Sequence, residues 1–153
     1  MLLDGIDHVA IVTKDTARFV EFYEAVFEAV VDGVQHPPFG TLTFVRIGDG
    51  RELNVFEIPD SDEADRQVPM FGRGRIDHIG FQAKDRAAFD EIRRRLMARG
   101  ATDGFVTDFG PAHSCFFRDP DGLECEVLLR VHNPGGQLND PGTPAPGYEV
   151  GVP

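Results

Sequence analysis

Two histidines occupy matching positions in a segment that the chain contains twice. Residues 6–21 read IDHVAIVTKDTARFVE and residues 76–91 read IDHIGFQAKDRAAFDE, so His8 aligns with His78. Each histidine lies in a stretch of β-type residues that predicts a strand. Imidazole is a common metal ligand, and two imidazoles from equivalent strands can lie around one point. The repeat therefore predicts a metal site.

The repeat continues into two hairpins and adds a carboxylate. Residues 44–55 align with 116–127, which brings Asn54 onto Glu126. Side chains of a strand alternate between its faces, so the apolar neighbours of these two residues face the core and the two polar side chains face the other way. An isolated carboxylate there is costly unless a positive charge accompanies it. A divalent cation held by the two histidines would supply that charge.

These residues are positioned by elements that follow the order β-α-β-β-β in each half. In the first half we expect strands at 5–13, 30–34, 41–47 and 52–58 and a helix that Asp15 or Thr16 caps. In the second half we expect strands at 75–83, 102–107, 113–118 and 122–130 and a helix over 85–99. Gly100 suits the left-handed end of that second helix.

The chain accordingly divides into four segments. We expect a first module at 1–59, a polar linker at 60–74, a second module at 75–132 and a tail at 133–153. The tail is rich in proline and glycine, so it is either loosely ordered or an arm laid across a neighbour, with Tyr148 as an anchor.

Composition excludes several classes of partner. The net charge of −11 argues against binding to nucleic acid and to anionic membranes. No apolar run approaches the roughly 20 residues that cross a bilayer, and no basic-then-apolar signal opens the sequence. We therefore expect a cytoplasmic protein that takes a small-molecule substrate. Cys115 and Cys125 show no metal-site spacing and are expected to be reduced thiols in the core.

The paired segments "DHVAIVTKD" and "DHIGFQAKD", followed by "FRDPDGLECEVLL", resemble the vicinal oxygen chelate superfamily. That superfamily includes glyoxalase I, extradiol ring-cleaving dioxygenases, methylmalonyl-CoA epimerase, and fosfomycin and bleomycin resistance proteins. The resemblance covers residues 5–130 and implies an α+β fold. Two tandem βαβββ modules would form a cup-shaped, barrel-like mixed sheet with the helices outside. It also implies a homodimer and one metal ion bound by His8, His78 and Glu126.

The fourth ligand position departs from the pattern of glyoxalase I. Proteins of that kind usually have a glutamate there, whereas the repeat places Asn54 at this position. Glu57 is the alternative, but it lies on the opposite face of its strand and would need a bulge to turn inward. Asn54 is the preferred candidate. The arginine that binds glutathione in glyoxalase I is also missing from the stretch Val9 to Val12.

Two imidazoles and one carboxylate form the facial triad of non-haem Fe(II) oxygenases. The leading prediction is therefore an Fe(II) extradiol-type dioxygenase that acts on a small substrate with vicinal oxygens. With Ni, Co, Zn or Mn the same ligands would act as a Lewis acid, which predicts a glyoxalase- or epimerase-type isomerase or lyase. A third hypothesis is a non-catalytic resistance protein that sequesters its ligand.

Three further residues are candidates for contact with the substrate. His113 begins the strand that leads into the second hairpin turn and is the predicted catalytic residue that moves a proton. Phe56 shares a strand face with Asn54, so it is predicted to line the substrate site. His36 lies in the loop HPPFG and is predicted to bind substrate at the mouth of the cup.

Overall fold

The structure is a computed structural model that describes residues 2, 5–66, 68, 71–72, 76–133 and 135–148. Its contacts divide it into two compact units. The first comprises Met1–Gln67 with Pro120–Gly122, and the second comprises Val68–Asp119 with Leu123–Pro153. The predicted linker and tail each fall partly outside the described residues.

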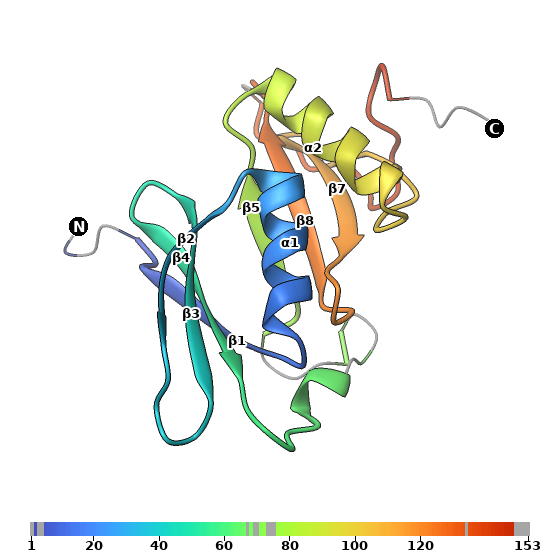
Figure 1. Cartoon of the computed structure of the whole chain (residues 1–153). Helices are drawn as coiled ribbons and strands as arrows, with labels where there is room; N and C mark the ends of the chain where they lie inside the picture. Colours follow the sequence, from blue (N-terminus) through green and yellow to red (C-terminus); the bar gives the residue numbers. More distant parts are fainter. Residues whose placement is uncertain are drawn as a thin grey trace. The chain divides into compact units, whose positions relative to one another are not determined.

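The first unit is a mixed sheet covered by one helix. Its elements are β1 (His8–Thr13), α1 (Thr16–Phe27), β2 (Val30–Gln35), β3 (Thr41–Gly48), β4 (Arg51–Glu57) and the short helix η1 (Glu63–Asp65). The strand order is β1-β4-β3-β2, with β1 parallel to β4 and the other pairs antiparallel (Figure 1). Helix α1 contacts β3 and β4, and it buries Phe19, Tyr23 and Val26 completely.

The second unit repeats this arrangement. Its elements are β5 (Ile79–Gln82), α2 (Arg86–Ala98), β6 (Thr107–Asp108), β7 (Ala112–Arg118) and β8 (Glu124–Arg130), in the order β5-β8-β7-β6. Strands β5 and β8 are parallel. The predicted α+β class and the repeated β-α-β-β-β order are confirmed, and each sheet is an open four-stranded sheet rather than a closed barrel.

Two strands of the second unit are much shorter than the sequence predicts. The strand expected at 75–83 is β5, which spans only Ile79–Gln82, and the strand expected at 102–107 is β6. Residues 102–106 do not join the sheet, and β6 contains only Thr107 and Asp108. Gly104 has a φ of 79°, a left-handed conformation that interrupts an extended chain. The hydroxyl of Thr102 accepts a hydrogen bond from the backbone N–H of Gly104 at 3.1 Å, which stabilises this turn.

The two sheets have the same register around the candidate ligands. Asn54 lies between Ala10 and Phe44 in the first unit. Glu126 has the same two neighbouring strands in the second unit, because Gly80 and Phe116 flank it. The predicted alternation of faces is confirmed, since the intervening apolar side chains are fully buried: Leu53, Val55, Cys125 and Val127.

The described part of the tail packs on its own unit. The backbone carbonyl of Thr143 accepts a hydrogen bond from the backbone N–H of Asp108 at 2.7 Å, and Ala145 donates to Val106 at 2.9 Å, so this segment lies beside β6. Tyr148 is buried, and its hydroxyl donates to Asp90 Oδ1 of α2 at 2.6 Å. The described part of the tail is thus anchored on its own unit through Tyr148.

None of the described helices has the length and apolar character that a membrane crossing requires.

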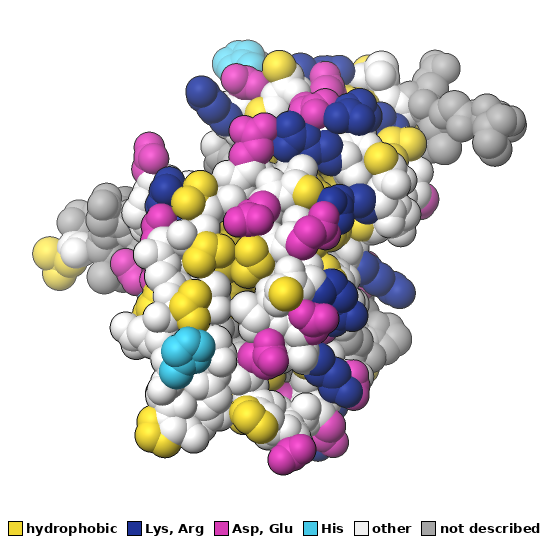
Figure 2. Space-filling view, viewed as in Figure 1, with side chains coloured by type: hydrophobic (Ala, Val, Ile, Leu, Met, Phe, Trp, Pro, Cys, Tyr) yellow, Lys and Arg dark blue, Asp and Glu magenta, His cyan; other side chains and the backbone are white. Residues whose placement is uncertain are grey.

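In the second unit, α2 bears several ion pairs on its surface, such as Arg94 with Glu91 at 2.7 Å. Figure 2 shows basic and acidic side chains interspersed over the region of this helix. Its arginine-rich face is therefore balanced by neighbouring carboxylates.

Replacing Tyr148 with Phe removes the hydrogen bond to Asp90 and should lower the free energy of unfolding by about 2 kcal/mol. Burial and the Asp90 carboxylate raise the pKa of Tyr148 above its ordinary value of 10.0. A raised pKa gives a stabilisation that is fully present below the ordinary value and is lost as pH rises towards the folded-state value. Urea unfolding should therefore show that the advantage of the native protein over Tyr148→Phe shrinks above pH ~10. Equal stabilities at neutral pH would contradict the anchoring role.

Candidate metal centre

The second unit brings an imidazole and a carboxylate together. His78 directly precedes β5, and Glu126 lies on β8, which runs parallel to β5. This pairing places His78 Nε2 3.4 Å from Glu126 Oε1. Both side chains are only partly exposed, at 30% and 13%, so they share a semi-enclosed environment in which a cation would be weakly screened.

Each of these two groups is held by a second polar residue. Asp77 Oδ2 lies 2.9 Å from His78 Nδ1, on the side of the ring away from Glu126. Ser114 Oγ donates to Glu126 Oε2 at 2.6 Å, and Ser114 is completely buried. One imidazole nitrogen and one carboxylate oxygen are thereby engaged, and the remaining nitrogen and oxygen face each other. Such outer partners are typical of protein metal ligands.

The absence of a side chain at Gly80 leaves room for the carboxylate of Glu126. Gly80 is the neighbour of Glu126 on the parallel strand. A methyl group at Gly80 would lie 3.1 Å from Glu126 Oε1 and 3.1 Å from Leu128 Cδ1, tighter than ordinary van der Waals contact. The glycine thus leaves room around the oxygen that faces His78. A nitrogen donor and an oxygen donor 3.4 Å apart fit a divalent transition metal.

The first unit repeats the histidine but not the carboxylate. His8 Nδ1 lies 2.8 Å from Asp7 Oδ1, as His78 does from Asp77. Asp7, His8 and Glu52 offer ligand atoms within 4.8 Å of one another, in an exposed part of the unit. The two units therefore share an Asp-His pair at the start of their first strand.

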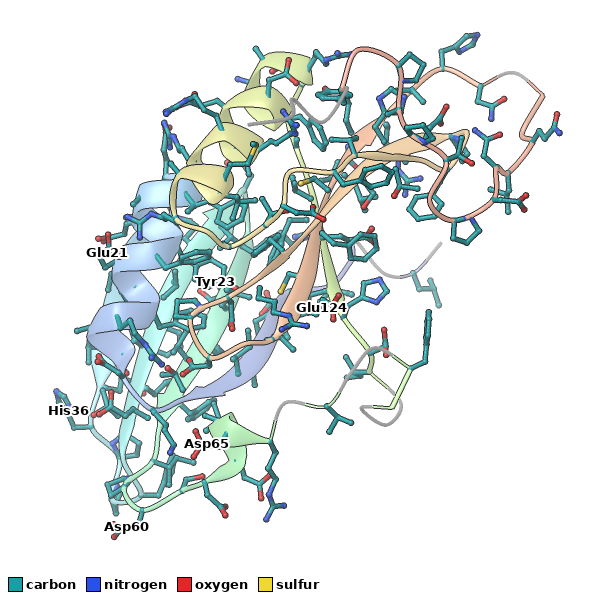
Figure 3. The ribbon with its side chains drawn as sticks, turned by 90° about the vertical axis from the view of Figure 1, so that its right-hand side faces the viewer. Glu21, Tyr23, His36, Asp60, Asp65 and Glu124 are labelled. Atoms are coloured by element: carbon teal, nitrogen blue, oxygen red, sulfur yellow. The ribbon has the colours of Figure 1, made fainter. Side chains whose placement is uncertain are left out.

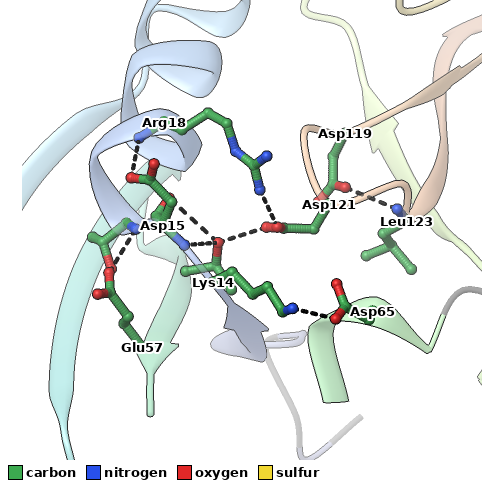
Figure 4. A network of polar contacts seen from close by, with 10 residues as sticks. Lys14, Asp15, Arg18, Glu57, Asp65, Asp119, Asp121 and Leu123 are labelled. Carbon is green, nitrogen blue, oxygen red and sulfur yellow. Dashed lines mark hydrogen bonds and ion pairs between the residues drawn. The ribbon is translucent and has the colours of Figure 1, made fainter. Parts of the chain in front are cut away.

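The two candidates for a fourth ligand have different environments. Asn54 lies at the position that corresponds to Glu126, and its Oδ1 is buried and accepts no hydrogen bond within the described part of the chain. Glu57 lies on the helix side, where its Oε2 accepts from the backbone N–H of Thr16 at 2.7 Å (Figure 4). Glu57 thus satisfies an N–H group at the start of α1 beside the Asp15 cap. This geometry favours Asn54 over Glu57 as the candidate for the fourth ligand.

His113 lies on the opposite face of the sheet from Glu126. It pairs with Leu129 on β8, and its ring is 6.0 Å from the ring of Tyr148, under the tail. Its Nε2 is 3.9 Å from Asp108 Oδ1. Strand alternation separates it from the face of Glu126 by the thickness of the sheet, so the geometry does not support the predicted catalytic role for His113.

The two predicted substrate-binding residues lie in the first unit. The ring of Phe56 is 6.2 Å from that of Phe39, which belongs to the loop before β3 and is 54% exposed. His36 is exposed in the same loop, with Nδ1 3.5 Å from Thr41 Oγ1 (Figure 3). Phe56 shares a strand face with Asn54, whereas no contact joins His36 to that face among the described hydrogen bonds.

Sequence reasoning assigns no role to several residues that surround the candidate ligands. Asp7 and Asp77 align in the repeat, so a signal for them exists in the sequence. Ser114 has no such signal, because its counterpart in the first half is Leu42. Gly80 likewise replaces Ala10 of the first half, and only its close approach to Glu126 in the folded chain shows why.

The sequence was compared with protein-family models and with curated proteins. The family model described as "Glyoxalase/Bleomycin resistance protein/Dioxygenase superfamily" matches residues 5–127. No curated protein sequence matches the chain.

Three solved structures share the fold. A glyoxylase/bleomycin resistance protein/dioxygenase domain from Frankia sp. EAN1pec is 19% identical, with a TM-score of 0.70 over 85% of this chain and 94% of that one. The fosfomycin resistance protein FosX from Listeria monocytogenes, complexed with Mn(II) and sulfate, is 20% identical, with a TM-score of 0.60 over 85% and 95%. The oxidase ChaP-H2 is 21% identical, with a TM-score of 0.63 over 89% and 100%.

The match of the family model over most of the sequence agrees with the duplicated β-α-β-β-β units and their shared register. The chain belongs to the glyoxalase/bleomycin resistance protein/dioxygenase superfamily.

Proposed function

We propose that the chain is a metal-dependent enzyme that binds one divalent ion through His8, His78 and Glu126. The observation that carries the proposal is the 3.4 Å pairing of His78 Nε2 with Glu126 Oε1. His8 is proposed as the third ligand because it repeats the Asp-His pair of the second unit. It would come from the same chain or from a second copy in a homodimer.

We further propose an Fe(II) extradiol-type dioxygenase that acts on a small substrate with two adjacent oxygens. Fe(II) with two imidazoles and one carboxylate keeps positions open for such a substrate and for O2. An isomerase of the glyoxalase kind needs a group that moves a proton, and the amide of Asn54 does not exchange protons as a carboxylate does. The carboxylate of Glu57 is engaged at Thr16. These two residues favour oxygen chemistry over proton transfer.

The side chains near Asn54 suit an aromatic or otherwise flat substrate. Phe56 and Phe39 form an apolar surface on the first unit. The amide of Asn54 carries both donor and acceptor atoms, so it can orient a substrate oxygen by a hydrogen bond. We propose that Phe56 contacts the body of the substrate and that Asn54 contacts its polar edge. His36 is a more peripheral candidate for substrate binding.

Replacing Glu126 with Gln, or His78 with Ala, should abolish tight metal binding. The loss should exceed the roughly 10–100-fold that removal of an outer partner costs, because a ligand itself is removed. Elemental analysis and calorimetric titration with Fe(II) under anaerobic conditions would measure it. His132→Ala is the matched control, since His132 is exposed and follows β8. Unchanged metal content in both ligand variants would refute the assignment, and a native protein without metal would instead favour the sequestering hypothesis.

Replacing Glu57 with Ala should weaken the start of α1 without changing metal content. Thr16 N–H then loses its acceptor, which should lower the free energy of unfolding by about 1 kcal/mol. Urea unfolding and elemental analysis on the same sample would separate the two effects. Loss of the metal in Glu57→Ala would show that Glu57 is a ligand, and the argument for oxygen chemistry would then fail.

Protein reconstituted with Fe(II) should consume O2 when a catechol or another vicinal-oxygen substrate is added. An oxygen electrode would measure uptake over a panel of such compounds, with Glu126→Gln as the negative control. The isomerase alternative predicts activity without O2 and with Ni or Co, seen as exchange of solvent deuterium into a ketone or thioester. Iron-loaded protein that leaves O2 unchanged with every diol would count against the dioxygenase.

A further inference from the structure

The contact between Asp77 and His78 sets the position of one proton. An ionised carboxylate only accepts hydrogen bonds, so the 2.9 Å contact with Asp77 Oδ2 requires the proton of the neutral ring to be on Nδ1. The lone pair of the neutral ring is then on Nε2, the atom that faces Glu126. Asp77 is itself held, because its other oxygen accepts a hydrogen bond from the backbone N–H of Phe71.

The contact between Ser114 and Glu126 sets the direction of the carboxylate. Ser114 is 0% exposed and lies on β7, the strand that pairs with β8 on the side away from β5. Its hydroxyl donates to Glu126 Oε2 at 2.6 Å, so Oε1 is left on the side of His78. A buried hydroxyl with this one strong acceptor restricts rotation of the carboxylate about its last bond.

The first unit has a counterpart for only one of these two contacts. Asp7 contacts His8 as Asp77 contacts His78. At the position of Ser114, however, the first unit has Leu42, and at the position of Glu126 it has Asn54. The buried hydroxyl therefore accompanies the carboxylate, and it is missing where the carboxylate is missing. This correlation points to a role of Ser114 that depends on Glu126.

We propose that Asp77 and Ser114 are positioning residues, which hold His78 and Glu126 so that Nε2 and Oε1 present their lone pairs to a common divalent cation. This inference rests on the proposed function, because it assigns the two residues to the same ion. Asp77 acts through the tautomer of His78, and Ser114 acts through the orientation of Glu126. Neither residue contacts the ion itself.

The experiment compares Asp77→Asn and Ser114→Ala with the native protein. Titration of the metal-free proteins with Co(II), followed by calorimetry and visible absorption, should show affinities about 10–100-fold weaker in each variant. Asp108→Asn is the matched control, because Asp108 is also a carboxylate near a histidine of the second unit, but on the other side of the sheet. It makes the same change of charge and should leave Co(II) affinity unchanged. Urea unfolding would verify that all variants fold.

A second measurement needs no metal. Long-range proton–nitrogen NMR spectra of the metal-free protein, at a pH where the rings are neutral, report which nitrogen of His78 is protonated. The native protein should show the proton on Nδ1, and Asp77→Asn should lose this preference, since its amide can also donate to Nδ1. A proton on Nε2 in the native protein, or native Co(II) affinity in both variants, would overturn the inference. If the native protein binds no Co(II), the proposed function fails, while the tautomer still decides the role of Asp77.

Discussion

In each unit the first strand lies beside the last one, and the two run parallel. The helix returns the chain after the first strand, and two antiparallel turns then bring the last strand back into the same direction. This pairing places the residue before or at the start of the first strand close to the side chains of the last strand. It brings His78 to Glu126 and His8 to Glu52. The buried side chains of α1, α2 and the sheets hold these strands in register, so the candidate ligands depend on the core for their position.

Much of this arrangement can be predicted from the sequence because both halves of the chain contain the same pattern of residues. The alignment of the two halves identifies His8, His78, Glu126 and Asn54, and strand alternation assigns their faces. Ser114 cannot be found in this way, since its role emerges only across two paired strands and has no counterpart in the first half. The side on which His113 lies is also hard to predict, because a residue at the start of a strand can follow either the strand or the loop.

The two units differ most around the position that Glu126 occupies. There the second unit has a carboxylate, a buried hydroxyl and a glycine, and the first unit has Asn54, Leu42 and Ala10. The register of the last two strands is nevertheless the same around this position. A duplicated scaffold can therefore specialise one copy by a few substitutions around one side chain, while both copies keep a histidine at or just before the start of their first strand.

The neutral amide at Asn54 has an electrostatic consequence. Two neutral imidazoles and a single carboxylate would leave one unit of positive charge on a divalent ion, whereas a glutamate in place of Asn54 would cancel it. The chain as a whole carries a net charge of −11, so an anion is repelled at long range. A monoanionic substrate oxygen would find a compensating charge at such an ion, so its recognition would depend on direct contact with the metal and not on the field of the whole chain.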